Sequence, residues 1–149
     1  MKKYLTLIVG IIILVALIGC KEIQQSVFDE IYQNAKVTGY GIKEITYEEF
    51  VKIRNSKEVY VLLDVLSTES FNNRHIPGAK SFPLGEINSF SAEKRISKNV
   101  RVIVYCASFS CQASTAAAKL LSSFGYKVLD YKGGLEEWGD KGNKFVSAE

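Results

Sequence analysis

Cys106 and Cys111 are the residues whose type and setting best suit covalent chemistry. Cys106 directly follows an apolar run at residues 100–105, which has the composition of a buried parallel strand. In open α/β sheets, ligands bind at the carboxyl ends of the strands, and the N–H groups of a following helix can stabilise an anion there. We therefore expect Cys106 to have a lowered thiol pKa and to act as a nucleophile.

A loop of small and polar residues joins Cys106 to the next predicted helix, and this loop contains Cys111. A buried cysteine can be inert, but such neighbours favour a reactive one. Across five residues of loop, Cys111 could form a disulfide with Cys106 or resolve a persulfide on it; alternatively it only fills space. The other residues of the expected active-site loop are Ala107, Ser108, Phe109, Ser110, Gln112 and Ala113.

Two polar residues are expected to brace the site rather than to react. His75 is the only histidine, and it precedes Ile-Pro-Gly-Ala, where a histidine more often fixes a loop by hydrogen bonding than acts as a base. Asp64 ends a predicted strand and is expected to brace a loop. A zinc site made of Cys106, Cys111 and His75 would have three ligands at an unfamiliar spacing, so we predict no metal and no other cofactor.

The elements that must position these residues alternate between strand and helix. Strands are predicted at residues 42–45, 59–65, 100–105 and 126–131, with a short extended piece at 81–84. Helices are predicted at residues 46–55 and 114–124 and around Trp138, with one helix or two broken turns at 85–96. Thr46 and Glu49 have the spacing of a capping box, and Gly125 suits a helix end. This alternation favours a small α/β domain with a central parallel sheet flanked by helices.

The flanks of this domain have simpler patterns. Apolar residues recur every four positions across residues 22–37, which predicts an amphipathic helix that ends before a turn at 38–41. We expect this helix to act as a spacer, or else to pack on the flank of the domain. Residues 141–149 are rich in charge and are expected to form a solvated tail.

Three stretches resemble the rhodanese-like family. Residues 63–65 (Leu-Asp-Val) followed by Phe71 and by residues 75–79 (His-Ile-Pro-Gly-Ala) are similar to the first family motif. Cys106 stands where the family has its catalytic cysteine, and residues 133–138 (Gly-Gly-Leu-Glu-Glu-Trp) resemble its C-terminal motif. The resemblance covers about residues 42–140. It implies a sulfurtransferase in which Cys106 takes a sulfane sulfur from a donor and passes it to a thiol acceptor or to cyanide.

The chain departs from the family pattern in the loop. Family members place an arginine five residues after the cysteine; that position is Cys111 here, or Ala113 when counted back from Gly125. No lysine or arginine occurs between Cys106 and Lys119. Without a cation to hold a dianion, we expect weak thiosulfate activity and a neutral or protein-borne persulfide as the donor. Two alternatives stay open, a dithiol redox protein that uses both cysteines and a non-catalytic interaction module.

The N-terminus has the features of an export signal. Lys2 and Lys3 precede an apolar run at residues 5–18, which is shorter than the roughly 20 residues that cross a bilayer and is typical of a signal peptide. Residues 17–20 (Leu-Ile-Gly-Cys) resemble the lipobox of bacterial lipoproteins. The resemblance implies a signal peptide at 1–19, a lipidated Cys20 and a spacer to residue 41, with the domain at the cell envelope facing outside the cytoplasm. The alternative is a plain N-terminal membrane anchor.

The charge balance excludes one class of partner. Setting aside Lys2 and Lys3 leaves 17 of the 19 basic residues against 16 acidic ones. Binding to nucleic acid needs clustered lysine and arginine to neutralise phosphates, and this nearly neutral chain offers no such cluster. Hydrophobic residues make up 47% and charged residues 23%, which is typical of a globular protein.

Overall fold

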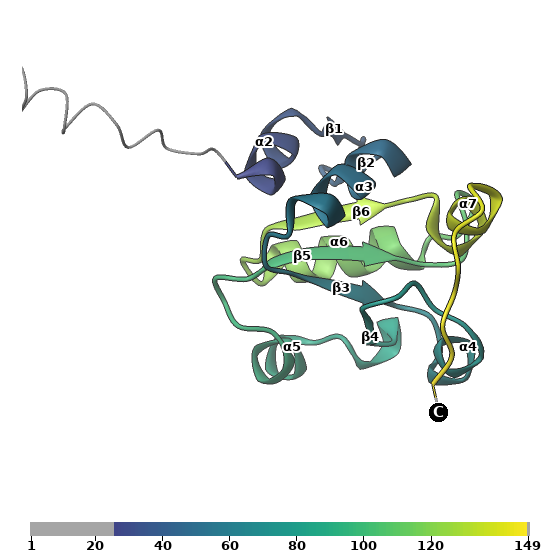
Figure 1. Ribbon diagram of the computed structural model, residues 1–149. Helices are drawn as coiled ribbons and strands as arrows, with labels where there is room; N and C mark the ends of the chain where they lie inside the picture. The colour runs from purple at the N-terminus through teal and green to yellow at the C-terminus, as the bar shows by residue number, and fades with distance from the viewer. Residues whose placement is uncertain (1–25, 149) are drawn as a thin grey trace, which may run out of the picture.

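A six-stranded sheet with helices on both faces forms the centre of the computed structural model, which describes residues 26–148 (Figure 1). The strand order is β1-β2-β6-β5-β3-β4, and β1 alone runs antiparallel to its neighbour. The strands are β1 (Lys36–Val37), β2 (Lys43–Ile45), β3 (Tyr60–Asp64), β4 (Ala79–Ser81), β5 (Arg101–Tyr105) and β6 (Val128–Tyr131). The predicted α/β fold with a central sheet is confirmed.

The helices differ from the prediction mainly at their ends. They are α2 (Val27–Asn34), α3 (Tyr47–Ser56), α4 (Thr68–Asn73), α5 (Ser89–Arg95), α6 (Ala113–Ser123), α7 (Gly134–Asp140) and a 3-10 turn, η1 (Leu84–Glu86). The capping box of α3 is formed: the Glu49 N–H donates to Thr46 Oγ1 at 3.2 Å, and the Thr46 N–H donates to Glu49 Oε2 at 2.8 Å. Helix α4 was not predicted. Across residues 26–148, every helix is too short or too polar to cross a bilayer.

Alternate residues of the central strands pack into two separate cores. On β5, Val102 and Val104 lie in the core beneath α5 and α6, together with Cys106. Ile103 and Tyr105 point to the opposite core, beneath α2, α3 and α7. This period of two is what a pleated strand buried on both faces requires. It places the Cys106 side chain on the α6 side of the sheet.

Helix α2 packs on the domain and is not a free spacer. Phe28 and Ile31 are buried in the same core as α3 and α7. The helix also ends earlier than predicted, because Ala35 leaves the helical conformation and Lys36–Val37 pairs with β2. The predicted start of this helix at residues 22–25 lies outside the described residues, as do Cys20 and the expected signal peptide.

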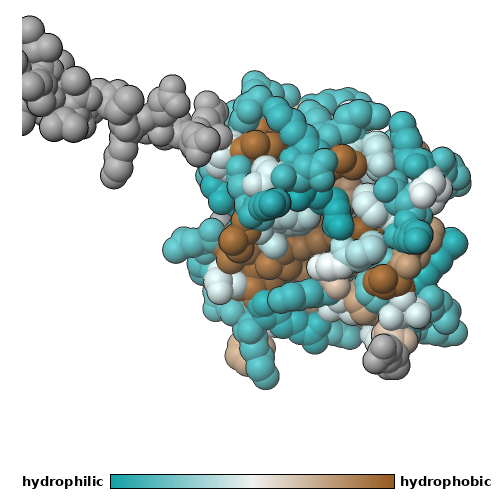
Figure 2. All heavy atoms as spheres, viewed as in Figure 1, coloured by the Kyte–Doolittle hydropathy of each residue, from teal (hydrophilic) through white to brown (hydrophobic). Residues whose placement is uncertain are grey.

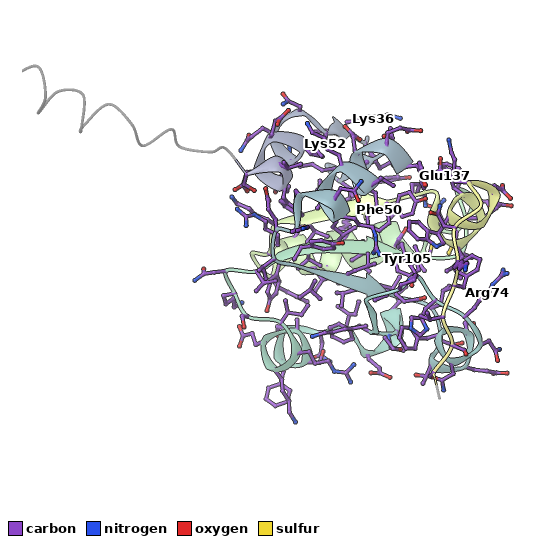
Figure 3. All side chains as sticks on the ribbon, in the orientation of Figure 1. Lys36, Phe50, Lys52, Arg74, Tyr105 and Glu137 are labelled. Carbon is purple, nitrogen blue, oxygen red and sulfur yellow. The ribbon has the colours of Figure 1, made fainter. Side chains whose placement is uncertain are left out.

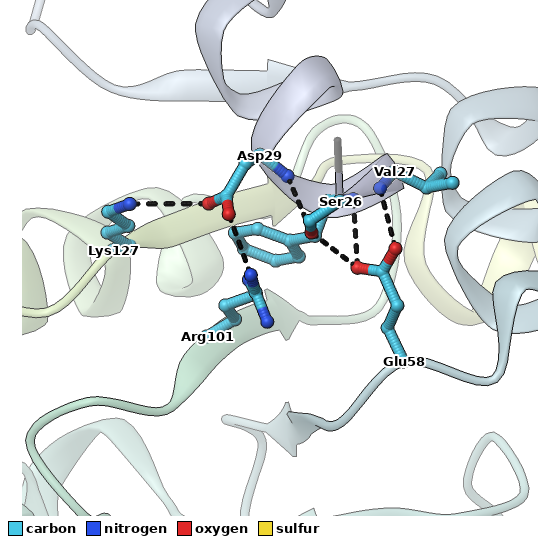
Figure 4. Close-up of polar contacts among 7 residues, drawn as sticks. Ser26, Val27, Asp29, Glu58, Arg101 and Lys127 are labelled. Carbon is cyan, nitrogen blue, oxygen red and sulfur yellow. Dashed lines mark hydrogen bonds and ion pairs between the residues drawn. The ribbon is translucent and has the colours of Figure 1, made fainter. Parts of the chain in front are cut away.

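Polar contacts fix the N-terminus of α2 to the strand starts (Figure 4). The carboxylate of Glu58 accepts hydrogen bonds from Ser26 Oγ and the Val27 N–H, both at 2.6 Å. Asp29 pairs with Arg101 at 2.7 Å and with Lys127 at 3.2 Å. These partners come from the segments that lead into β3, β5 and β6, so α2 is held at the amino-terminal edge of the sheet.

The C-terminal residues 141–148 contact the domain through a few backbone and aromatic groups, while most of their side chains are exposed, as expected of a solvated tail. The backbone N–H of Val146 donates to the carbonyl of His75 at 3.1 Å, and the His75 N–H donates in return at 2.8 Å. The indole of Trp138 donates to the Lys144 carbonyl at 3.0 Å, and Phe145 packs on the core of α7. Counting charges missed these backbone and aromatic contacts.

A hydrophobic surface lies over β3, between α3 and α5 (Figure 2). Between β3, β4 and α5 lies a pocket of about 240 Å³, to which Val61, Leu63 and Phe82 contribute. Cys106 and the loop of residues 107–113 do not line this pocket.

Candidate active site

Cys106 lies at the carboxyl end of β5, beneath the N-terminus of α6. Its side chain is fully buried under the loop of residues 107–111. The sulfur is 3.4 Å from the carbonyl oxygen of Cys111 and 3.4 Å from Ser114 Oγ. Ser114 is the second residue of α6, so the sulfur lies beside the first turn of this helix. The thiol therefore meets a helix N-terminus, as the sequence predicted.

The ionisation of Cys106 differs from the prediction. Burial raises the pKa of the Cys106 thiol, and the neighbouring thiol of Cys111 raises it further. The hydroxyl and N–H of Ser114 act in the opposite direction and are outweighed. The expected lowering of the Cys106 pKa is therefore wrong, because desolvation of the buried thiol outweighs the effect of Ser114.

Cys111 is the more readily ionised of the two free thiols. Partial burial opposes its ionisation, but the Cys106 thiol, the N–H groups of Ala107 and Ala113, and the charge of Lys132 together lower the pKa of the Cys111 thiol. The Cys106 sulfur lies 3.4 Å from the backbone carbonyl oxygen of Cys111, so the two cysteines are neighbours at the site. This proximity suits proton sharing and thiol–disulfide chemistry.

Lys132 is a cation that the sequence analysis missed. It directly follows β6, and its ammonium group donates to the carbonyl of Cys111. The chain between Cys106 and Lys119 has no lysine or arginine, but the parallel pairing of β5 and β6 brings the end of β6 to the same edge of the sheet. The Val-Leu-Asp-Tyr-Lys sequence at 128–132 could have indicated it, since a lysine after a buried strand must lie at that edge.

The loop contributes to two open pockets. One has a volume of about 610 Å³ and is lined by Phe109, Lys132 and Glu137, among others. The second, of about 420 Å³, is lined by Ala107, Ser108 and Arg74. Glu137 and Arg74 lie on the α7 side of the molecule in Figure 3. Small molecules can therefore approach the loop from two directions.

Gly134, the first residue of α7, lets the backbone of this helix approach the loop closely. Gly134 has a φ of +58°, and a Cβ there would lie 2.2 Å from the Cys106 carbonyl oxygen. This close approach lets the Leu135 N–H donate to the Cys106 carbonyl at 3.1 Å and the Glu136 N–H donate to the Ala107 carbonyl at 2.9 Å. The conformation needs glycine, because a side chain there would be strained and would clash.

Bonds within the loop close the turn over the thiol. The Cys111 N–H donates to the Ser108 carbonyl at 3.0 Å, and the hydroxyls of Ser108 and Ser110 are 3.0 Å apart. Gln112 reaches the Ser110 carbonyl at 3.5 Å, while the Phe109 ring is more than half exposed. The turn leaves the large apolar side chain of Phe109 exposed to solvent.

Asp64 and His75 occupy bracing positions. Asp64 is buried and accepts a hydrogen bond from the Leu66 N–H at 2.9 Å. The ring of His75 stacks on Phe71, with centroids 3.8 Å apart, and its Nδ1 lies 2.8 Å from the Phe71 carbonyl oxygen. The hydrogen bonds of the Cys106 thiol involve neither residue.

Comparison with known proteins agrees with this arrangement. The family model described as rhodanese-like domain matches residues 46–141. The chain is 32% identical over 102 residues to YrkF of Bacillus subtilis, which is named as a candidate sulfur carrier protein. That match covers 68% of this chain and 53% of YrkF, so the chain spans about half the length of this relative. It is also 33% identical over 75 residues to the thiosulfate sulfurtransferase PspE of Escherichia coli, which covers 50% of this chain and 70% of PspE.

Solved structures share the fold. The crystal structure of the BH2092 protein from Bacillus halodurans superposes with a TM-score of 0.64 at 30% identity, over 70% of this chain and 76% of that one. The rhodanese-like domain of the Alr3790 protein from Anabaena gives a TM-score of 0.62 at 24% identity, over 70% of this chain and 78% of that one. The second likeness concerns the fold alone.

Proposed function

Since the chain belongs to the rhodanese-like domain family, we propose that it is a sulfur-transfer protein in which Cys106 carries a sulfane sulfur as a persulfide. The observation that supports this role is the setting of Cys106 at the end of β5, where its thiol lies 3.4 Å from Ser114 Oγ in the first turn of α6. The Cys106 thiolate attacks the outer sulfur of a persulfide donor R–S–SH. The donor S–S bond breaks, R–S⁻ leaves with the bonding electron pair, and Cys106 becomes a persulfide.

Cys111 offers a route for discharging this persulfide. Its thiolate attacks the inner sulfur of Cys106, a Cys106–Cys111 disulfide forms, and the outer sulfur leaves as hydrosulfide. The two cysteines are oxidised and the sulfane sulfur is reduced, so an external dithiol must then reduce the disulfide. The lowered pKa of Cys111 and its reach to Cys106 support this resolving role. Direct attack of an acceptor thiol on the outer sulfur is the other route.

We propose a persulfide rather than thiosulfate as the preferred donor. The Cys106 sulfur is enclosed, and the cation of Lys132 is directed at Cys111 instead of at a space beside Cys106. A thiosulfate dianion would lose its hydration there without a matching cation. The relative PspE carries thiosulfate in its name, so a thiosulfate:cyanide assay beside PspE checks this preference. Turnover equal to that of PspE would contradict it.

The persulfide itself is tested by mass spectrometry of the protein after exposure to a persulfide donor. We expect a cyanide-labile adduct of about 32 Da, one sulfur atom, on the Cys106 peptide. It should be absent in Cys106→Ser and should persist longer in Cys111→Ser. A Cys106–Cys111 disulfide without any adduct would overturn sulfur transfer in favour of a dithiol redox protein, which the proximity of the two cysteines also fits. Unreactive, unmodified thiols would instead indicate an interaction module, consistent with the burial of Cys106.

We propose further that the mature protein is anchored at the cell envelope through a lipidated Cys20, with its domain outside the cytoplasm. The support is the sequence alone: Lys2 and Lys3, the apolar run at residues 5–18, and Leu-Ile-Gly-Cys at 17–20. Intact-mass measurement of the membrane fraction checks this, because Cys20→Ser should lose the lipid mass and the membrane association together. A plain membrane anchor would keep residues 1–19 and would not depend on Cys20.

A further inference from the structure

A pocket of about 420 Å³ lies between the start of the active-site loop, the end of α4 and helix α7. Ala107 and Ser108, the two residues that follow Cys106, form part of its wall. Helix α7 is fixed to the same stretch of chain by backbone hydrogen bonds to the Cys106 and Ala107 carbonyls, at 3.1 and 2.9 Å. A ligand in this pocket therefore contacts the loop that covers the reactive thiol.

Arg74 supplies a cation to this pocket. It directly follows α4 in an extended conformation and lies between α4 and α7 in Figure 3. Its guanidinium group lies over the ring of Phe145, with Cζ 5.1 Å from the ring centroid. Within residues 26–148, Arg74 forms no ion pair. The N–H donors lie in the plane of the guanidinium group, at the edge that the ring does not cover, and this planar fork suits a carboxylate.

The C-terminal segment holds the backbone of Arg74 in place. On one side of it, the N–H of His75 donates to the Val146 carbonyl at 2.8 Å, and the Val146 N–H donates in return at 3.1 Å. On the other side, the Ala148 N–H donates to the Asn72 carbonyl at 3.1 Å. A cation whose backbone is already fixed loses less conformational entropy when it binds a ligand than one on a free loop.

Two carboxylates on α7 line the same pocket. Glu136 and Asp140 are four residues apart, so they lie on one face of the helix. The lining therefore combines one cation at the end of α4 with two anions on α7, and Leu135 and Phe145 contribute apolar surface. A ligand with both an anionic and a cationic group matches these charges, whereas a purely anionic ligand would be repelled by the two carboxylates.

We propose that this pocket binds a small zwitterionic persulfide as the sulfur donor, an α-amino acid with a persulfide side chain. Its carboxylate pairs with Arg74, and its ammonium group lies toward Glu136 and Asp140. The inference rests on the proposed sulfur transfer and names the class of donor. The Cys106 thiolate attacks the outer sulfur, the donor S–S bond breaks, and the thiolate of the amino acid leaves with the bonding electron pair. Arg74 is thus a substrate-binding residue that determines specificity.

The position of the pocket favours a donor whose charges lie away from its sulfur. Cys106 is fully buried and does not line the pocket, so the donor sulfur must pass the loop while the charged groups stay outside. In an amino-acid persulfide, a short carbon chain separates the carboxylate from the sulfur atoms. In thiosulfate, the charged oxygens are bonded directly to the leaving sulfur and would have to enter the buried site with it, at a large desolvation cost.

Sulfur loading of Cys106 by matched donors tests this assignment. The adduct is measured by peptide-resolved mass spectrometry in the full chain, with the persulfides of cysteine, of mercaptopropionate, which lacks the ammonium group, and of cysteamine, which lacks the carboxylate. The wild type should have its lowest KM for cysteine persulfide. Arg74→Met should raise the KM for cysteine and mercaptopropionate persulfides roughly three- to fivefold and leave that for cysteamine persulfide unchanged.

Other variants separate the two charges of the pocket. Glu136→Gln combined with Asp140→Asn should raise the KM for cysteine and cysteamine persulfides only, because these carry the ammonium group. Arg95→Met is the matched control, since Arg95 also lies over an aromatic ring, that of Phe82 at 4.6 Å, but lines a pocket away from the loop. It should leave all three donors unchanged.

The outcomes against this pocket differ from those against sulfur transfer. Equal KM values for the three donors in the wild type, or an equal rise for all three in Arg74→Met, would overturn the selection of a zwitterion. If no donor loads Cys106, the proposed sulfur transfer fails instead. The pocket is then tested with S-methylcysteine, which cannot transfer sulfur: it should shift the amide NMR signals of Ala107 and Ser108, and more weakly in Arg74→Met. Absence of these shifts in the wild type would refute the pocket by itself.

Discussion

At the residue scale, the two cysteines have opposite environments. Burial raises the pKa of Cys106, whereas backbone N–H groups and Lys132 outweigh partial burial at Cys111 and lower its pKa. The thiol that is more exposed is also the one more easily ionised. At neutral pH, Cys111 is therefore expected to react first with a small alkylating reagent, and Cys106 to react more slowly because its thiol is buried.

Lys132→Met tests the electrostatic part of this picture. Removing the ammonium group takes away a charge that favours the Cys111 thiolate, so the pKa of Cys111 should rise and its alkylation at neutral pH should slow several-fold. Peptide-resolved alkylation across a pH series measures this change. Lys36→Met is the matched control, because Lys36 lines the same pocket without contacting Cys111. Equal effects of the two variants would show that Lys132 acts only through the overall charge of the pocket.

Gly134→Ala tests the close contact between Gly134 and the backbone carbonyl of Cys106. A methyl group at this left-handed position would meet the Cys106 carbonyl oxygen at 2.2 Å, so the loop must move. We expect a loss of about 1–3 kcal/mol from backbone strain, with the clash adding to it, and loss of the sulfur adduct. Thermal unfolding and adduct mass measure the two effects. Gly85→Ala, where a methyl group meets open space, should leave both unchanged; a stable Gly134→Ala variant with a normal adduct would show that this contact does not position Cys106.

The sequence predicted some site residues and missed others for a topological reason. Cys106 could be predicted because its pattern is local: an apolar strand, then the cysteine, then a loop of small and polar residues. Lys132 directly follows β6, and it reaches the site only because β6 pairs with β5. The direction of the Cys106 pKa could not be derived either, since it depends on how completely the loop covers the sulfur.

At the element scale, the amino-terminal edge of the sheet is tied together by α2. Hydrogen bonds from Arg101 and Lys127 lower the pKa of Asp29. Burial opposes the ionisation of Glu58, but hydrogen bonds from Ser26, Val27 and Phe28 outweigh it and lower its pKa. Both folded-state values lie below the ordinary 3.8 and 4.5. The stability they contribute is therefore present above those ordinary values and is lost as the pH falls through the lowered ones.

Glu58→Gln should loosen α2 locally. The amide cannot accept the same charge-assisted hydrogen bonds from the helix N-terminus, so about 1 kcal/mol of helix stability should be lost. Amide hydrogen exchange in α2 should be faster in the variant at neutral pH. In the wild type, exchange should become faster as the pH falls from the ordinary pKa of Glu58 through its lowered value, and this acid-induced change should be smaller in the variant. Glu30→Gln, on the exposed side of the same helix, should have little effect. The idea fails if exchange in α2 is the same in both variants.

Local patterns predicted the elements whose stability is local. The capping box at Thr46 and the apolar runs of β3 and β5 carry their own signals, and their positions agree with the structure to within one or two residues. The short strand β1 and the bridge between His75 and Val146 depend on pairing with distant segments. Such pairings leave little trace in periodicity, so the prediction extended the first helix through β1 and did not include the bridge.

At the scale of the whole molecule, the chain enters the fold at the edge of the sheet opposite to the thiols. The contacts of Ser26 and Asp29 are made with the segments leading into β3, β5 and β6. Cys106 and Lys132 lie at the far ends of β5 and β6, toward α7 in Figure 1. A five-residue strand spans about 17 Å. The proposed anchor and the proposed site are thus separated by the depth of the sheet.

This polarity predicts how an anchored domain presents its site. Only residues 21–25 separate Cys20 from Ser26, and even a fully extended chain of that length reaches about 18 Å. The amino-terminal edge should therefore face the bilayer, and the loop of residues 107–111 should face soluble donors and acceptors.

Fluorescence quenching of the lipidated protein on vesicles tests this orientation. One fluorophore is attached at Asn99→Cys, on the near edge, and another at Phe109→Cys, both in a background where Cys106 and Cys111 are serine. Spin-labelled lipid should quench the fluorophore at position 99 more strongly than the one at position 109. Lengthening the segment at 21–25 with flexible residues should reduce the difference, because the domain could then turn. Stronger quenching at position 109 would mean that the site faces the membrane and that its sulfur donor or acceptor is to be sought there.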